Sequence, residues 1–188
     1  MLVDGVNVKD YTFDALYDRL GYVTQKAVLF AGTVQDNVFF GESTVPETDE
    51  ALSKALSLSQ AAEFVGKYPE GAAHPIAQLG RNVSGGQKQR LSIARALARK
   101  PEILVFDDSF SALDYRTDAT LREGLAKELP NTTKVIVAQR ISTIRHADQI
   151  IVLDRGEIAG IGRHEDLMQS CKVYREIAMS QLSASELA

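Results

Sequence analysis

Four consecutive residues in this sequence have the types and spacing needed to bind an anion. Ser84, Gly85, Gly86 and Gln87 form a glycine turn directly before a helical pattern. A serine followed three residues later by a glutamine fits a capping box, and the two glycines let a ligand approach the backbone amides without a Cβ in the way. Free N–H groups at the positive end of a helix dipole bind anions such as phosphate. Taken alone, the same turn is more often a simple helix cap.

Two adjacent carboxylates form a second candidate group. Asp107 and Asp108 come directly after a continuous apolar run that begins at Ile103. Such a run is typical of a central parallel strand covered on both faces, and open α/β sheets bind ligands at the carboxyl ends of their strands. Carboxylates placed there suit a Mg²⁺ ion that carries phosphates. Taken alone, paired aspartates after a strand are more often a solvated turn.

Regular elements must position these two groups. Residues 88–99 predict a helix, because apolar side chains recur at helical spacing and the pattern stops before Pro101. Apolar runs at 134–138 and 149–153 predict two more strands, and helical patterns separate the strands. This alternation predicts a three-layer α/β fold with a parallel sheet.

The whole stretch from Asn82 to Asp114 resembles the nucleotide-binding domain of ATP-binding cassette (ABC) transporters. VSGGQ is similar to the family's signature motif, ILVFDD to its Walker B strand and SALD to its D-loop. The resemblance implies ATP and Mg²⁺ as ligands, with Asp107 on the metal and Asp108 in the position of the base that acts on the attacking water. It also implies that Asp114 serves the nucleotide in cis, and that Ser84–Gln87 serve, in trans, the nucleotide of a second such domain.

Gln25 matches the glutamine of the family's Q-loop, because it directly follows a predicted strand at residues 22–24. The resemblance implies that this glutamine contacts Mg²⁺ and the attacking water, and that it couples the site to a transmembrane domain. The following text, KAVLFAGTVQDNVFFG, resembles that of exporters. Four of its apolar residues are candidates, in equal measure, for contact with the membrane partner or for the core: Leu29, Phe30, Phe39 and Phe40.

The resemblance also predicts the organisation of the chain. An α/β core is expected over residues 1–25 and 100–165, a helical subdomain with the signature over 33–99, and a C-terminal helix and tail over 166–188. The expected fold is a P-loop NTPase-like parallel sheet of the ABC ATPase type with an inserted α-helical subdomain, truncated on its N-terminal side.

Local patterns add four expectations within this organisation. Residues 47–65 and 164–181 each predict one continuous helix, and residues 134–138 predict a buried strand. Residues 183–188 are expected to fray.

Two motif positions depart from the family pattern. Asp108 stands where the family usually has glutamate, and Gln139 ends the strand that usually ends in the switch histidine. The shorter acid holds its carboxylate ~1 Å farther away, and such a misplacement can cost ~10²-fold in rate. An amide can hydrogen-bond a phosphate, but it cannot become cationic. Both changes predict a slow site, as in the degenerate half of a heterodimeric exporter that lends an intact signature to its partner's site.

The family's P-loop, G-x-x-x-x-G-K-[ST], does not occur in the 188 residues. The only Gly-Lys pair is Gly66-Lys67, which is followed by Tyr68. In the family the P-loop precedes the text that begins here, so we expect a fragment with exposed apolar surface where the P-loop helix would pack. We also expect poor binding of Mg-ATP by the chain alone. The alternative function is a non-hydrolysing, regulatory or vestigial dimerisation partner.

Composition excludes several other classes of protein. An apolar content of 45% suffices for a core, while a net charge of −4 and a pI near 5.4 argue against a nucleic-acid partner. A single cysteine, Cys171, excludes a disulfide framework. Neither a signal-peptide pattern nor an apolar run of ~18–20 residues is present. We therefore expect a protein held peripherally at the cytoplasmic side of the membrane by its partner. A chromosome-maintenance ATPase is disfavoured by the exporter-like Q-loop text.

Overall fold

The computed structural model describes residues 1–181, so the predicted fraying of residues 183–188 lies outside the described part. Contacts divide the chain into two units, Met1–Val137 and Ala138–Ala188, and each unit has a hydrophobic core of its own. The elements of the first unit are β1 (Leu2–Val3), β2 (Val6–Asn7), η1 (Val8–Asp10), α1 (Phe13–Tyr17), β3 (Leu20–Val23), β4 (Gly32–Thr33), α2 (Val34–Val38), α3 (Asp49–Leu58), α4 (Ala62–Val65), η2 (Gly71–Ala73), β5 (Pro75–Ile76), η3 (Gln78–Gly80), α5 (Gly85–Ala98), β6 (Ile103–Asp107), α6 (Tyr115–Glu128) and β7 (Thr133–Val137). The described elements of the second unit are α7 (Ile141–Ile144), β8 (Ile150–Asp154), β9 (Glu157–Gly162), α8 (His164–Ser170) and α9 (Lys172–Gln181).

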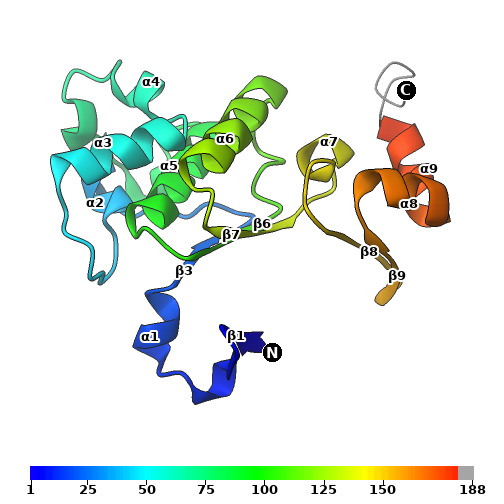
Figure 1. Ribbon diagram of the computed structural model, residues 1–188. Coiled ribbons are helices and arrows are strands. Elements are labelled where there is room, and N and C mark those ends of the chain that lie inside the picture. The colour runs from blue at the N-terminus through cyan, green and yellow to red at the C-terminus, as the bar shows by residue number, and fades with distance from the viewer. Residues whose placement is uncertain (182–188) are drawn as a thin grey trace. The chain divides into compact units, whose positions relative to one another are not determined.

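A three-stranded parallel sheet in the order β3–β6–β7 forms the centre of the first unit (Figure 1). Val23 lies opposite Phe106, which in turn lies opposite Ile136. Val23 and Phe106 are fully buried, and they share one core with side chains of α5 and α6. The prediction of a parallel α/β fold is therefore confirmed, and the sheet places Asp107 at the end of its central strand.

The opposite face of this sheet is exposed. Tyr22 lies opposite Val105, and Val105 opposite Val135. Exposed fractions are 56% for Tyr22, 48% for Val135 and 53% for Val137. The predicted strand at 134–138 thus exists as β7, but the prediction that it is buried is wrong, because alternate side chains face away from the core. This face therefore carries exposed apolar side chains; that it is where a P-loop helix would pack stays a prediction.

The helical part of the first unit packs around α5, which contacts α2 and α3 most extensively among the helices. The single helix predicted over residues 47–65 is wrong, because α3 and α4 are separate helices. Gln60 adopts the left-handed conformation, with φ 60°. Its N–H donates to Ser57 O at 3.0 Å, and the N–H of Ala61 donates to Leu56 O at 2.8 Å. These two bonds are a Schellman motif, which ends a helix.

The second unit combines a β-hairpin with a pair of helices. Strands β8 and β9 pair antiparallel around Arg155 and Gly156, which both have positive φ. The single terminal helix predicted over residues 164–181 is wrong, because Cys171 has an extended backbone that separates α8 from α9. No helix within residues 1–181 is long and apolar enough to cross a membrane.

Candidate functional site

The glycine turn is the N-cap of α5, a helix of 14 residues. Ser84 Oγ accepts a hydrogen bond from the N–H of Gln87 at 3.3 Å, and Gln87 Oε1 accepts one from the N–H of Ser84 at 2.8 Å. This reciprocal pair confirms the predicted capping box. Because the cap closes at Ser84, the helix begins at Gly85 rather than at the predicted Lys88.

The two glycines of the turn present free amides to open space. Within residues 1–181, the N–H groups of Gly85 and Gly86 have no hydrogen-bond partner. A Cβ added at Gly85 would meet no atom within 4 Å, and one at Gly86 would lie 3.5 Å from Ala112 O. Unpaired amides at the positive end of a helix dipole fit a phosphate group that approaches the backbone closely.

Gln25 and Asp108 are joined directly, although 83 residues separate them in sequence. Gln25 Nε2 donates to Asp108 Oδ2 at 3.0 Å, and Asp108 is only 8% exposed. An ionised carboxylate can only accept, so the amide must turn its nitrogen towards Asp108 and its Oε1 away from it. The pair therefore leaves one amide oxygen of Gln25 available to a water or a metal ion.

The backbone fixes Asp108 as well. Its φ is 44°, in the left-handed region, and its N–H donates to Val137 O at 3.0 Å. Its carbonyl accepts from Ser111 Oγ at 2.7 Å. Aspartate tolerates this conformation better than longer side chains do, because its short polar side chain bonds locally. The short acid at this position thus matches a local backbone requirement.

Asp107 has a partner that sequence reasoning missed. The hydroxyl of Tyr22 on β3 donates to Asp107 Oδ2 at 3.0 Å. This bond raises the pKa of the Tyr22 phenol, because ionising the donor would destroy the bond. The strand register is what brings the two residues together: Tyr22 is opposite Val105, and Asp107 follows Val105 by two residues on the same face of the sheet.

Asp107 fits a Mg²⁺ ion that is delivered with phosphates. Residues 1–181 contain no group of three or more His, Cys, Asp or Glu side chains that could hold a metal by themselves. Mg²⁺ is usually bound by one or two carboxylates together with substrate phosphates and water. The structure joins Gln25 to Asp108 rather than to Asp107, so a metal role for Gln25 stays a prediction that depends on its free Oε1.

Two other predicted site residues have structural contacts. Asp114 is the N-cap of α6: it accepts from the N–H of Thr117 at 3.0 Å and from Thr117 Oγ1 at 2.7 Å. These bonds, chiefly the one from the N–H, lower the pKa of Asp114. Gln139 belongs to the second unit, where its carbonyl accepts from Gln181 Nε2 at 2.8 Å. The nucleotide roles of Asp114 and Gln139 stay predictions.

The four candidates for membrane-partner contact divide into two kinds. Leu29 is fully buried and Phe39 packs against the core, so these two are core residues. Phe30 and Phe40 are 42% and 47% exposed, and their rings stack with centroids 4.0 Å apart. We call these two residues the aromatic pair.

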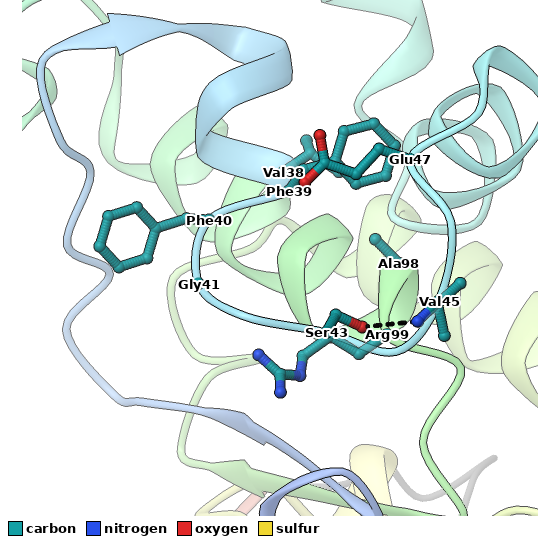
Figure 2. A pocket seen from close by; sticks show the side chains of 9 residues that line it. All are labelled: Val38, Phe39, Phe40, Gly41, Ser43, Val45, Glu47, Ala98 and Arg99. Atoms are coloured by element: carbon teal, nitrogen blue, oxygen red, sulfur yellow. Dashed lines mark hydrogen bonds between the residues drawn. The ribbon is translucent and has the colours of Figure 1, made fainter.

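A small hollow adjoins the aromatic pair. In Figure 2 the loop that follows α2 curves around it, and the ring of Phe40 points outward from this loop, away from the other labelled side chains. Ser43 Oγ accepts from the N–H of Val45 at 3.2 Å and so closes this loop. None of the residues predicted to bind nucleotide lines the hollow, which is formed by Val38, Phe39, Phe40, Gly41, Ser43, Val45, Glu47, Ala98 and Arg99.

Known proteins resemble the chain over nearly its whole length. Residues 1–111 match the ABC transporter family. An uncharacterized ABC transporter ATP-binding protein of Mycobacterium bovis is 45% identical over 98% of this chain and 32% of its own length. A putative multidrug export ATP-binding/permease protein of Staphylococcus aureus is 38% identical over 94% of this chain and 30% of its own length. The structure of a bacterial Atm1-family ABC exporter with ATP bound superposes with a TM-score of 0.89 and 34% identity, over 95% of this chain and 31% of that one.

The parallel sheet, the acidic strand end and the capped signature helix define an α/β protein of the ATP-binding class. Because the family match extends over more than half of the chain, the protein belongs to the ABC transporter family. Its fold is that of the nucleotide-binding domain of ABC exporters, which confirms the resemblance seen in the sequence. The chain spans about a third of the length of the relatives it matches.

Proposed function

We propose that this chain is part of an ATP-binding subunit of an ABC exporter, and that it serves two nucleotide sites. The helix turn at Ser84–Gln87 contacts the phosphates of ATP held by a second nucleotide-binding domain. Asp107, Asp108 and Gln25 face a nucleotide on the chain's own side. Nucleotide roles for Asp114, in the first unit, and for Gln139, in the second, are parts of the same proposal. Bound Mg²⁺ supplies positive charge that neutralises the phosphates, and Asp107 is the carboxylate that holds it.

The observation that carries this proposal is the state of the signature turn. Its capping box is complete, and the amides of Gly85 and Gly86 are open and have no partner in the described part of the chain. A cap that served only to start the helix would not need two adjacent glycines, because serine and glutamine already satisfy the capping bonds. The glycines are explained by a ligand that must come within bonding distance of the backbone.

The geometry of Asp107 and Asp108 supports the proposal that ATP bound on the chain's own side is hydrolysed slowly. Asp108 is short, nearly buried and bonded to Gln25, so it reaches less far towards a water than glutamate would. This geometry favours the degenerate half of a heterodimer over a competent ATPase. It also keeps open the second candidate function, a regulatory partner that dimerises without hydrolysing ATP.

The aromatic pair supports a membrane partner. Its two stacked rings are each more than two-fifths exposed and together form an apolar patch on the surface. Such exposed apolar patches mark sites of contact with another protein. We propose that the transmembrane domain of the exporter contacts them, and that this contact holds the chain at the cytoplasmic side of the membrane.

The test is titration calorimetry with Mg-ATP, for this chain alone, for a P-loop-containing nucleotide-binding domain alone, and for both together. We expect no binding by this chain alone, and tighter binding by the second domain when this chain is present. Gly85→Ala should remove that gain and weaken the shared site by about tenfold, because a methyl group then stands where a phosphate bonds the amides.

Gly124→Ala is the matched control for this experiment. Gly124 lies on α6, and its added Cβ would make only an ordinary contact, 3.7 Å from Leu58 Cδ2. This variant should keep the full gain in affinity. Tight binding of Mg-ATP by this chain alone, or an equal gain with Gly85→Ala, would contradict the proposal.

A further inference from the structure

The segment between β3 and the aromatic pair has no regular secondary structure. It covers residues 24–30, and we call it the connector. Gln25 lies near its beginning and Phe30 at its end. Backbone groups outside helices and sheets still need hydrogen-bond partners wherever they leave water. In the connector, side chains of two helices supply those partners.

Gln89 of helix α5 holds the first end of the connector. Its side chain is 1% exposed, and its Nε2 donates to Thr24 O at 3.2 Å. Thr24 directly precedes Gln25, and Gln89 lies two residues after the signature residue Gln87. One buried amide thus connects the signature helix to the backbone that carries Gln25.

Arg95, on the same helix, holds the second end. Its NH1 group donates to Val28 O at 3.0 Å, and its Nε donates to Asn37 O at 2.7 Å. Asn37 of α2 is 1% exposed and bonds both backbone groups of Phe30: Oδ1 accepts from the N–H at 2.9 Å, and Nδ2 donates to the carbonyl at 2.9 Å. The NH2 group of Arg95 donates to the same Oδ1 at 3.0 Å.

The guanidinium of Arg95 also supports the aromatic pair. It lies 5.5 Å from the ring centre of Phe30 and 5.3 Å from that of Phe40. Within residues 1–181, Arg95 makes no ion pair with a carboxylate. The guanidinium of Arg95 therefore faces carbonyl oxygens, one amide and two aromatic rings. These contacts hold the connector and the aromatic pair in place.

We propose that three side chains, which we call the connector clamp, are positioning residues that make the connector a rigid link between Gln25 and the aromatic pair. A displacement of the aromatic pair then reaches the bond between Gln25 and Asp108, and it does so through the signature helix. This inference rests on the proposed function, in which the aromatic pair meets a partner and Gln25 faces nucleotide. The members of the connector clamp are Gln89, Arg95 and Asn37.

The clamp can be tested without nucleotide or membrane, by NMR on the 188-residue chain. The side-chain NH₂ signals of Gln25 report its bond to Asp108, and Phe40→Ala perturbs the opposite end of the connector. We expect Phe40→Ala to shift the Gln25 signals in the wild-type background and to leave them unmoved in the Arg95→Lys background. Lysine keeps the charge, but its donors sit on one nitrogen and cannot reproduce the planar fork by which Nε, NH1 and NH2 of Arg95 reach three separate acceptors.

Amide exchange gives a second readout in the same samples. The N–H of Phe30 should exchange about tenfold faster in Arg95→Lys, because the bonds that fix its acceptor are lost, while the amides of α6 keep their rates. Arg99→Lys is the matched control, since Arg99 caps the same helix and pairs only loosely with Asp18, at 3.7 Å. It should keep both the wild-type shift and the wild-type exchange rate.

Two results would overturn the clamp. One is a Gln25 signal that does not respond to Phe40→Ala in the wild type, and the other is an equal response in the Arg95→Lys background. If Arg95→Lys does not fold, Gln89→Met breaks the other end of the clamp and is judged by the same criteria. Failure of nucleotide binding in the calorimetry leaves these signals unchanged, so the two proposals fail separately.

Discussion

At the scale of single residues, Asp108 combines a short carboxylate with a left-handed backbone. Asp108→Glu should lower the free energy of unfolding by about 1 kcal/mol, because a longer side chain gains less local bonding at this φ. Asp108→Asn should keep the stability, since asparagine tolerates the same conformation. Urea unfolding of the three chains measures both effects. If Asp108→Glu were as stable as the wild type, the left-handed backbone at this position would not favour aspartate over glutamate.

Asp108 and Gln139 together lead to a prediction about turnover. Asp108→Glu combined with Gln139→His should raise ATP hydrolysis by about 10²-fold in an assembly that supplies a P-loop, because the carboxylate then reaches the water. A colourimetric phosphate assay on the assembled pair of domains measures the change. Unchanged turnover would favour the regulatory partner over the slow ATPase.

Ser109 directly follows Asp107 and Asp108. Its side chain is fully buried, and its Oγ has no hydrogen-bond partner among residues 1–181. Ser109→Ala should therefore raise the free energy of unfolding by about 1 kcal/mol, because the desolvated hydroxyl is removed at little cost in packing. Ser111→Ala is the matched control: its Oγ donates to Asp108 O at 2.7 Å, so the same substitution should be destabilising. Thermal unfolding of both variants decides whether the signs differ.

At the scale of elements, the end of α3 depends on one left-handed residue. Gln60 occupies the position of a Schellman motif that glycine usually takes, with φ 60°. Gln60→Gly should raise the free energy of unfolding by about 1 kcal/mol, because glycine adopts this conformation without the Cβ penalty. The bond from the Arg90 side chain reaches the backbone carbonyl of Gln60 and remains available, while only the exposed bond from Gln60 Nε2 to Ser57 O at 3.2 Å is lost. Gln60→Ala is the control, and it should bring no such gain in chemical denaturation.

The same residue shows why the helix boundaries were only partly predictable. Apolar periodicity correctly located the helices on both sides of Gln60, but a break at glutamine has no sequence signal, unlike one at glycine. The end of α8 at Cys171 likewise has no glycine or proline to signal it in the sequence. The existence of the strands and the capping box were predictable, because they depend on residues within a few positions of each other, although the strand ends were not: the strand expected at 22–24 is β3, Leu20–Val23.

In the candidate site, too, the features that depend on neighbouring residues were predictable and those that depend on distant residues were not. Ser84 and Gln87, like Asp107 and Asp108, were found because each pair is local in sequence. The phenol of Tyr22 was missed, because its bond to Asp107 depends on the register between two strands. A single sequence does not contain that register.

At the scale of the whole molecule, the two units have separate cores, and the sheet of the first unit has one exposed apolar face. Tyr22, Val135 and Val137 are exposed large apolar side chains on that face. Such a face is a site for association with another chain. The isolated chain should therefore self-associate in a concentration-dependent way.

Replacing Val135 and Val137 by threonine tests the role of this face. Threonine has nearly the same shape and keeps strand propensity, so the fold should persist while the face becomes more polar. The apparent dissociation constant from sedimentation velocity should rise by about tenfold, because two apolar groups are lost from the contact. Val6→Thr is the matched control, since Val6 is 44% exposed on the β1–β2 hairpin and outside the face. If this control weakens self-association as much as the double variant does, the sheet face is not the contact surface.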